Sequence, residues 1–178
     1  MKSSKIFLFI LLFVVLYVFI FRNNKSDTTT TKAINIYRFE QTLFTTDSIK
    51  IKDDILEWET ELGSFFERFN QEILRTNSQS AGYRDEILAF ISYPDMREAY
   101  DTLMKKYPYV AFLERDLADA FDRYKQHFPE RKVPKVITYF SGFNFGVVTN
   151  DSILAIGLDY FLGKDCCFYK RLSFPEYM

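Results

Sequence analysis

The sequence has almost no histidine and little cysteine, and these shortages argue against several kinds of site. Of the 178 residues only His127 is a histidine, and the two cysteines, Cys166 and Cys167, are neighbours. A catalytic zinc ion commonly has three protein ligands with histidine prominent, and a serine triad needs a histidine base. We therefore predict no catalytic residues, no metal site and no bound cofactor.

Two adjacent cysteines cannot provide the CxxC spacing of redox and metal sites. A bridge between neighbours rarely satisfies disulfide geometry, so we expect two free thiols, with a strained vicinal disulfide or an intermolecular bridge as the alternatives. His127 stands near the end of a predicted helix. There we expect it to contact the last carbonyl groups rather than a metal ion.

An excess of positive charge is also missing. From Ala33 onward, 18 Lys and Arg residues stand against 23 Asp and Glu residues, which gives a net charge of about −5. Domains that bind nucleic acid carry a basic stripe, and none is visible. We predict no nucleic-acid partner.

Charge is wholly absent from residues 6–21, which form one apolar run. As a helix the run would reach roughly 24 Å, slightly less than a hydrocarbon core of about 30 Å, and Tyr17, Arg22 and Lys25 can extend to the headgroups. No small-residue cleavage site follows, nor does a cysteine for lipid attachment. We expect an uncleaved signal anchor, with a cleaved signal peptide as the alternative.

The chain thus divides into three parts. Residues 1–22 are the expected single transmembrane anchor, residues 23–32 a polar linker, and residues 33–178 one α+β domain with its own core. Basic residues flank the apolar run almost equally, so charge alone does not indicate which side of the membrane the domain occupies.

Periodicity predicts one leading strand, then helices, then strands. A period of two indicates a strand over 34–39, and a helical period indicates helices over 53–73, 83–91, 96–107 and 109–128. Asp54 and Glu57 resemble a capping box. Strands are expected over 136–140, 145–149 and 153–156.

Asn150-Asp151 favours a tight hairpin with positive φ values between the last two strands. The prediction is therefore about four helices packed on a small, mostly antiparallel sheet, with an aromatic-rich core. The acids of the 109–128 helix are expected to form a solvated face, the alternative being metal ligands.

The most distinctive string is residues 157–165, where two glycines bracket an aromatic pair and two acids. Its candidate partner-binding or structural residues are Gly157, Asp159, Tyr160, Gly163 and Asp165. Asp159 stands where a strand ends, and we expect its carboxylate to cap the following 160–162 turn. Contact with a partner is the alternative.

Several motifs in order carry a family resemblance. They are Ile36-Tyr-Arg-Phe-Glu40, Phe128-Pro129, Val133-Pro-Lys-Val136, Ser141-Gly-Phe143, the 157–165 string, Tyr169 and Pro175-Glu-Tyr177. Together they resemble the gliding motility-associated lipoprotein GldB family. The resemblance implies an envelope protein needed for gliding, distantly similar to zinc peptidases but without their active-site helix. It also implies that this chain is an amino-terminal, truncated version that lacks the lipid-attachment cysteine.

Three functional hypotheses follow. We favour a membrane-anchored, non-enzymatic cell-envelope protein in gliding motility or associated protein secretion, single-pass, with its body on the periplasmic side and other envelope motility or secretion proteins as partners. The alternative is an inactive peptidase-like module that binds a peptide. A hydrolase that uses acids alone, or is completed in trans, is disfavoured by the single histidine. The sequence does not indicate an oligomeric state.

Overall fold

The computed structural model describes residues 34–175. The predicted anchor (1–22) and linker (23–32) lie outside these residues. Within 34–175 no helix combines the length and apolar character needed to cross a bilayer.

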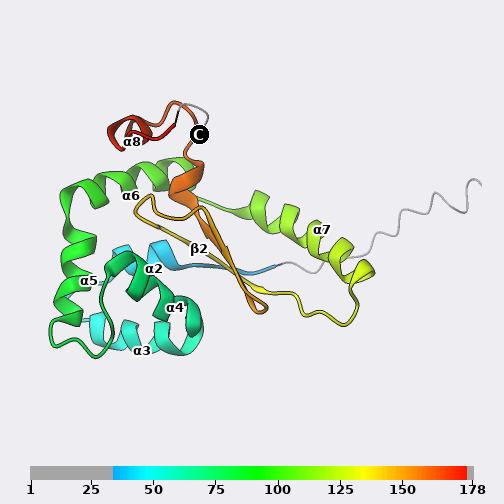
Figure 1. The fold of residues 1–178 in the computed structure, drawn as a ribbon, viewed down its shortest axis with the longest axis horizontal. Coiled ribbons are helices and arrows are strands. Elements are labelled where there is room, and N and C mark those ends of the chain that lie inside the picture. Colours follow the sequence, from blue (N-terminus) through cyan, green and yellow to red (C-terminus); the bar gives the residue numbers. More distant parts are fainter. Residues whose placement is uncertain (1–33, 176–178) are drawn as a thin grey trace, which may run out of the picture. The chain divides into compact units, whose positions relative to one another are not determined.

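The domain is α+β, with a four-stranded sheet in the order β1-β2-β4-β3 (Figure 1). The strands are β1 (Ile36–Arg38), β2 (Lys135–Tyr139), β3 (Val147–Thr149) and β4 (Ile153–Gly157). β1 and β2 are parallel, β2 and β4 are parallel, and only β3 and β4 are antiparallel. The prediction of a mostly antiparallel sheet is therefore wrong.

The reason lies in which strands are buried. The last four residues of β2 are buried on both faces of the sheet, whereas β3 is exposed at two of its three positions. β4 therefore pairs with β2 at the centre, and β3 folds back as an outer hairpin strand. A strand buried on both faces is typical of a parallel sheet. Closeness of two strands in the sequence does not show whether they pair in parallel.

Seven α-helices accompany the sheet in the described residues, where about four were predicted. They are α2 (Phe39–Thr45), α3 (Ile51–Leu62), α4 (Ser64–Phe69), α5 (Tyr83–Ser92), α6 (Pro94–Lys106), α7 (Ala111–His127) and α8 (Cys167–Arg171). The predicted 53–73 helix breaks at Gly63, whose φ is +48°, and continues through α4 into the π-helical turn η1 (Asn70–Leu74). The short helices α2 and α8 were missed, and α2 begins at Phe39, where the strand was expected to continue.

The capping box at Asp54 and Glu57 is also wrong, because α3 begins earlier and has no side-chain cap. Instead, Asp47 Oδ1 accepts the N–H groups of Ile49 and Lys50 at 2.8 and 2.9 Å and turns the chain into the helix. The Asp54 carboxylate accepts the Thr46 hydroxyl at 2.5 Å.

The predicted β3–β4 hairpin is confirmed, but its turn differs from the predicted one. Positive φ values were predicted at Asn150 and Asp151, and neither residue has one. The Asn150 side-chain oxygen accepts the N–H groups of Ser152 and Ile153 at 2.9 and 2.8 Å. This Asx arrangement closes the turn without the left-handed conformation.

The core is rich in aromatic rings, as predicted. Phe39 is fully buried at its centre. Four rings meet it edge-on at centroid distances of 5.0 to 5.9 Å: Trp58, Phe65, Phe66 and Phe69. Such edge-to-face pairs add about 0.5–1.5 kcal/mol each beyond burial, so α2 is fixed against α3 and α4.

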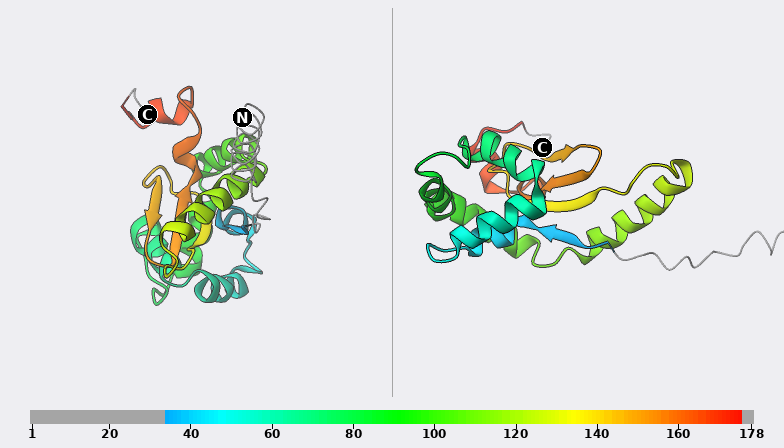
Figure 2. Two further views of the ribbon diagram at one scale, coloured as in Figure 1. Left: turned by 90° about the vertical axis from the view of Figure 1, so that its right-hand side faces the viewer. Right: turned by 90° about the horizontal axis from the view of Figure 1, so that it is seen from below.

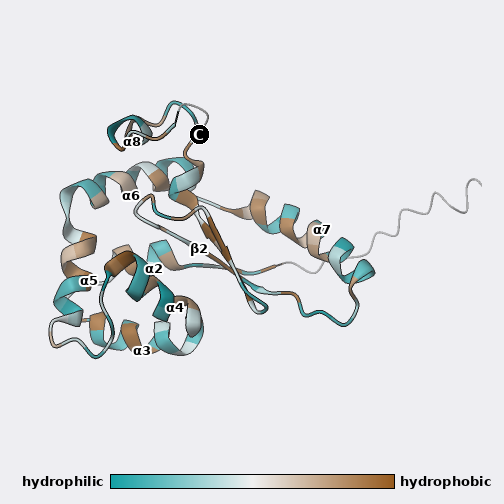
Figure 3. Cartoon of the chain, viewed as in Figure 1, coloured by the Kyte–Doolittle hydropathy of each residue, from teal (hydrophilic) through white to brown (hydrophobic). Residues whose placement is uncertain are grey.

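Helix α7 extends away from the other helices (Figures 1 and 2) and alternates hydrophobic and hydrophilic segments along its length (Figure 3). Its inner side includes Leu117 and Phe121, both half-buried, while Asp116 and Asp119 are exposed, as predicted for a solvated face. The expected contact of His127 with the last carbonyl groups of α7 is not among the hydrogen bonds of the described residues. Lys125 Nζ instead donates to Pro129 O and Arg131 O, beyond the helix end, at 2.5 and 2.8 Å.

Candidate functional site

Asp159 is the best-connected residue of the candidate string. It lies in η2 (Leu158–Phe161), the 3-10 turn that follows β4, and its side chain is fully buried. Oδ1 accepts the Ser141 N–H at 3.0 Å, while Oδ2 accepts the Ser141 hydroxyl at 2.8 Å and the Phe143 N–H at 2.5 Å. The carboxylate therefore joins the turn after β4 to the loop after β2.

The sheet topology explains this meeting. Because β2 and β4 are parallel neighbours, the segments that follow their carboxyl ends leave the same edge of the sheet. The expected cap of the 160–162 turn is wrong, since η2 has no side-chain cap and the Asp159 carboxylate binds the Ser141–Phe143 loop instead. The mostly antiparallel sheet expected from the sequence concealed that contact.

Ser141 organises the other side of the junction. Its Oγ donates to Asp159 and accepts the N–H groups of Asn144 and Phe145 at 3.1 and 3.2 Å. Gly142 and Phe143 both have positive φ, +62° and +60°, a conformation that a phenylalanine rarely adopts. The buried carboxylate holds this tight loop by accepting two of its N–H groups and one hydroxyl. Sequence reasoning assigned Ser141 no such role.

Position 157 requires glycine because the backbone of Phe145 lies too close to leave room for a side chain. A Cβ atom there would lie 2.1 Å from the carbonyl oxygen of Phe145. The Gly157 N–H also donates to the Gly146 carbonyl at 2.8 Å. The predicted importance of this glycine thus has a steric cause at the end of β4.

Burial raises the pKa of the Asp159 carboxyl to about 6, against the hydrogen bonds from Ser141 and Phe143 that favour its charged form. The group is mostly ionised at neutral pH. Its oxygens are occupied by the loop and have no contact with solvent.

Two tyrosines support the turn. The Tyr169 hydroxyl donates to the Asp159 carbonyl at 3.0 Å and accepts the Leu162 N–H at 2.9 Å. The predicted site residue Tyr160 lies half-buried, with its ring 3.5 Å from the position a Cβ would take at Gly146. Both rings pack against Phe174, at centroid distances of 5.7 and 5.6 Å.

Gly163 and Asp165 lie elsewhere, on the surface. Gly163 has a φ of +100°, so the chain turns sharply there. Both residues line an open groove with Lys105 and Lys106 of α6 and with Lys164. The five predicted residues therefore do not form one site: Gly157 and Asp159 belong to the buried junction, and Gly163 and Asp165 to this groove.

Cys166 and Cys167 border the same groove as free thiols, as expected. Within residues 34–175, no three His, Cys, Asp or Glu side chains gather as metal ligands.

A second buried carboxyl group follows β1. Glu40 is fully buried, and its Oε1 accepts the Arg38 Nε at 2.7 Å. Its Oε2 and the neighbouring strand's Thr138 hydroxyl have no hydrogen-bond partner among the described residues. Burial raises the pKa of the Glu40 carboxyl, and the Arg38 guanidinium opposes that rise. Sequence reasoning gave Glu40 no role beyond its place in a motif.

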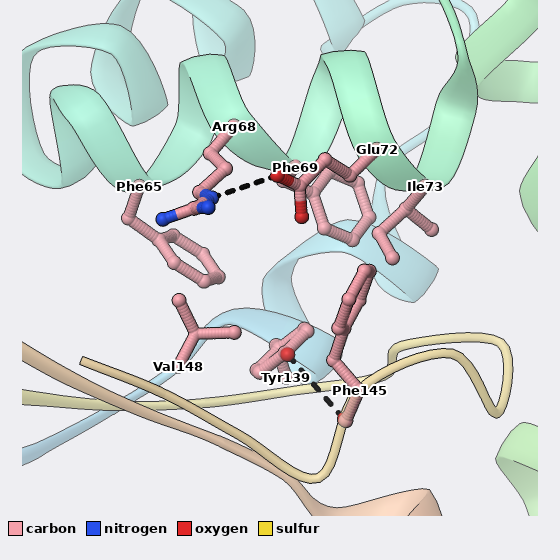
Figure 4. Close-up of a pocket in the computed structure, with 8 residues that line it drawn as sticks. All are labelled: Phe65, Arg68, Phe69, Glu72, Ile73, Tyr139, Phe145 and Val148. Carbon is pink, nitrogen blue, oxygen red and sulfur yellow. Dashed lines mark hydrogen bonds and ion pairs between the residues drawn. The ribbon is translucent and has the colours of Figure 1, made fainter.

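A narrow apolar slot of about 10 Å³ lies between α4 and the outer strand β3 (Figure 4). An ion pair from Arg68 to Glu72, 2.8 Å long, crosses its rim. The remaining lining residues are Phe65, Phe69, Ile73, Tyr139, Phe145 and Val148. The sequence did not reveal this slot, because it depends on how the α4–η1 face lies over the sheet.

The family model described as gliding motility protein GldB matches residues 22–178. This chain belongs to the GldB family. No curated protein and no solved structure matches it, so the distant likeness to zinc peptidases stays a prediction.

Four of the motifs behind the GldB resemblance lie at or next to the carboxyl edge of the parallel strands. Glu40 follows β1, the Ser141–Phe143 loop follows β2, and Asp159 follows β4, with Tyr169 bound to its carbonyl. In this GldB-family chain these residues hold the edge of the sheet together.

Proposed function

We propose that this GldB-family chain is a membrane-tethered, non-enzymatic envelope protein that supports gliding motility or associated protein secretion by presenting its folded body to other envelope proteins. The family match supports the role in gliding. The apolar run at 6–21 supports the tether. The periplasmic side for the body rests on the envelope role that the GldB resemblance implies.

One observation carries the non-enzymatic part of the proposal. Asp159, the most distinctive acid of the family-like string, is fully buried and accepts three hydrogen bonds from Ser141 and Phe143. A general acid or base must lie within hydrogen-bond reach of the proton it transfers. This carboxylate already serves the protein's own loop, which favours a structural role.

The test is deletion of the chain in a gliding bacterium that encodes it, followed by complementation with the full-length wild type. We expect colony spreading, or secretion of proteins that support it, to fail on deletion and to return on complementation. Normal spreading and secretion after deletion would overturn the proposed role. A periplasmic reporter fused after Pro175 checks the sidedness, and a reporter active only in the cytoplasm would contradict it.

Peptide binding is the second candidate function, and the outer position of β3 favours it. β3 has a strand neighbour only on the β4 side among the described residues, and the apolar slot opens beside it (Figure 4). An extended peptide that adds a strand to such an edge can lay alternate side chains against the apolar residues at the mouth of the slot.

The matched variants for peptide binding are Phe145→Ala in the slot and Phe128→Ala outside it, since both rings are partly exposed. With full-length protein in detergent and an array of apolar extended peptides, we expect the Phe145 variant alone to lose binding. Equal binding by wild type and both variants would dismiss the slot as the binding site.

A further inference from the structure

An aromatic cluster stands exposed where α6, α7 and η2 meet. Tyr109, Phe112 and Phe161 are 81, 45 and 48 % exposed. Tyr107 links two of them, because its ring stacks on Phe112 at 6.2 Å and its hydroxyl donates to the Phe161 carbonyl, and Tyr109 lies two residues further along the chain. Single exposed apolar residues are ordinary, but three exposed aromatic residues near the junction of α6, α7 and η2 form a surface.

Three lysines line the open groove beside Leu162, the residue after Phe161. Lys105 and Lys106 end α6, and Lys164 follows Gly163, where a Cβ atom would lie 3.9 Å from Lys106 Nζ. None of the three ammonium groups makes an ion pair within the described part of the chain. Asp165 is the acid in the same groove, so the lysines leave it net positive on a body that is net negative.

This surface is fastened to β1, the first described strand after the expected tether in the sequence. The Arg38 guanidinium donates to the Tyr107 and Pro108 carbonyls at 2.8 and 2.9 Å, which binds the α6–α7 loop to strand β1. Arg38 stands four residues after Ile34, about 13 Å of extended chain, and residues 22–33 span up to about 40 Å. A bilayer holding residues 6–21 therefore lies within reach.

We propose that Tyr109, Phe112 and Phe161, with Lys105, Lys106 and Lys164, form a second membrane contact that lays the body on an anionic lipid surface. Aromatic rings favour the headgroup level and lysines favour anionic lipid, so the two components of this aromatic–lysine patch suit one partner. Residues 6–21 attach the chain to the membrane, and the patch would set the orientation of the body on it. The inference therefore rests on the tether of the proposed function.

The experiment uses the full chain reconstituted in vesicles of phosphatidylethanolamine with phosphatidylglycerol, or of phosphatidylcholine alone. An environment-sensitive dye is attached at Tyr109→Cys in a Cys166→Ser, Cys167→Ser background. A dye at Ile49→Cys is the control, since Ile49 is exposed on the loop before α3. Iodide quenching measures exposure of the dye, while flotation of the protein with the vesicles measures the tether separately.

On anionic vesicles we expect iodide quenching at position 109 to fall about threefold or more relative to phosphatidylcholine, while quenching at position 49 stays unchanged. The triple variant Lys105→Glu, Lys106→Glu, Lys164→Glu should restore quenching without loss of flotation. Its charge-matched control is Lys50→Glu, Lys52→Glu, Lys132→Glu, which should not restore it.

Equal quenching of the dye at position 109 on both kinds of vesicle, with flotation intact, would overturn the proposed lipid contact of the patch. The tether by residues 6–21 would be unaffected by that result. Protection seen only in native envelope membranes also overturns it, because the surface would then bind an envelope protein. Loss of flotation in the wild type contradicts the tether itself.

Discussion

The two halves of the 157–165 string differ in what surrounds them. Gly157 and Asp159 are buried and committed to neighbouring backbone, whereas Gly163 and Asp165 are exposed beside lysines. Nine residues of sequence thus serve two purposes: they fasten the sheet edge and they shape a surface. A compact motif in the sequence need not form one site.

The comparison also separates what each half can tolerate. The buried junction has almost no free space, since a single methyl group at Gly157 meets a carbonyl. The groove is open, so side chains there can change without a clash. We therefore expect stability to depend on the junction and interactions to depend on the groove and its rings.

The largest effect is expected for Gly157→Ala. The added Cβ would lie 2.1 Å from Phe145 O, so β4 and the loop must separate, and we expect a loss of about 4 kcal/mol or failure to fold. Gly82→Ala is the control, because its nearest neighbour would be a Glu86 side-chain atom at 3.9 Å. Urea unfolding of the two variants measures the difference, and near-equal stabilities would show that the junction is not tightly packed.

The second largest effect is expected for Asp159→Ala, which should lower the free energy of unfolding by about 3 kcal/mol. The substitution leaves the Ser141 hydroxyl and two buried N–H groups without their acceptor. Asp165→Ala removes the same chemical group from the exposed half and should change stability by less than about 0.5 kcal/mol. Similar losses in both variants would erase the distinction between the halves.

The pH dependence of stability gives a further contrast. Because burial raises the pKa of Asp159 from 3.8 to about 6, the folded state holds this proton more tightly than the unfolded state. Its contribution is complete below about pH 3.8 and is lost as pH rises through about 6, an effect of up to about 3 kcal/mol.

The wild-type curve includes Glu40, whose pKa burial also raises, so the informative quantity is the difference between wild type and Asp159→Asn. That difference should slope between about pH 4 and 6. A flat difference over this interval would contradict the burial of Asp159.

The smallest predicted effect is that of Tyr169→Phe. It removes the hydroxyl that joins Asp159 O to the Leu162 N–H, and about 1–2 kcal/mol of stability should go with it. Urea unfolding measures the loss, and in the same measurement Tyr109→Phe, at an exposed ring, should be neutral. Destabilisation by Tyr109→Phe instead would mean that the exposed ring also supports the fold.

Much of the fold was predictable because period-two and helical patterns are local. The segments β2, β3, β4, α5, α6 and α7 match predicted elements to within a few residues. The aromatic core followed from ring content, and the free cysteines from their adjacency. The GldB resemblance was confirmed by the family match.

The pairing of strands was not predictable in the same way. The helices between β1 and β2 bring the chain back so that β2 runs parallel to β1. β4, rather than the preceding strand β3, then lies next to β2. Both are long-range choices that a hairpin pattern conceals. The error extended to Asp159, whose partner at Ser141 becomes visible only once β2 and β4 are parallel neighbours.

Gliding activity per folded molecule shows whether Asp159 only fastens the fold or also does chemistry. Full-length wild type and Asp159→Asn would be expressed in the deletion strain, with folded protein quantified by protease resistance in intact envelopes. We predict that gliding declines only in proportion to the folded protein. Fully folded Asp159→Asn protein that supports no gliding would contradict a purely structural role.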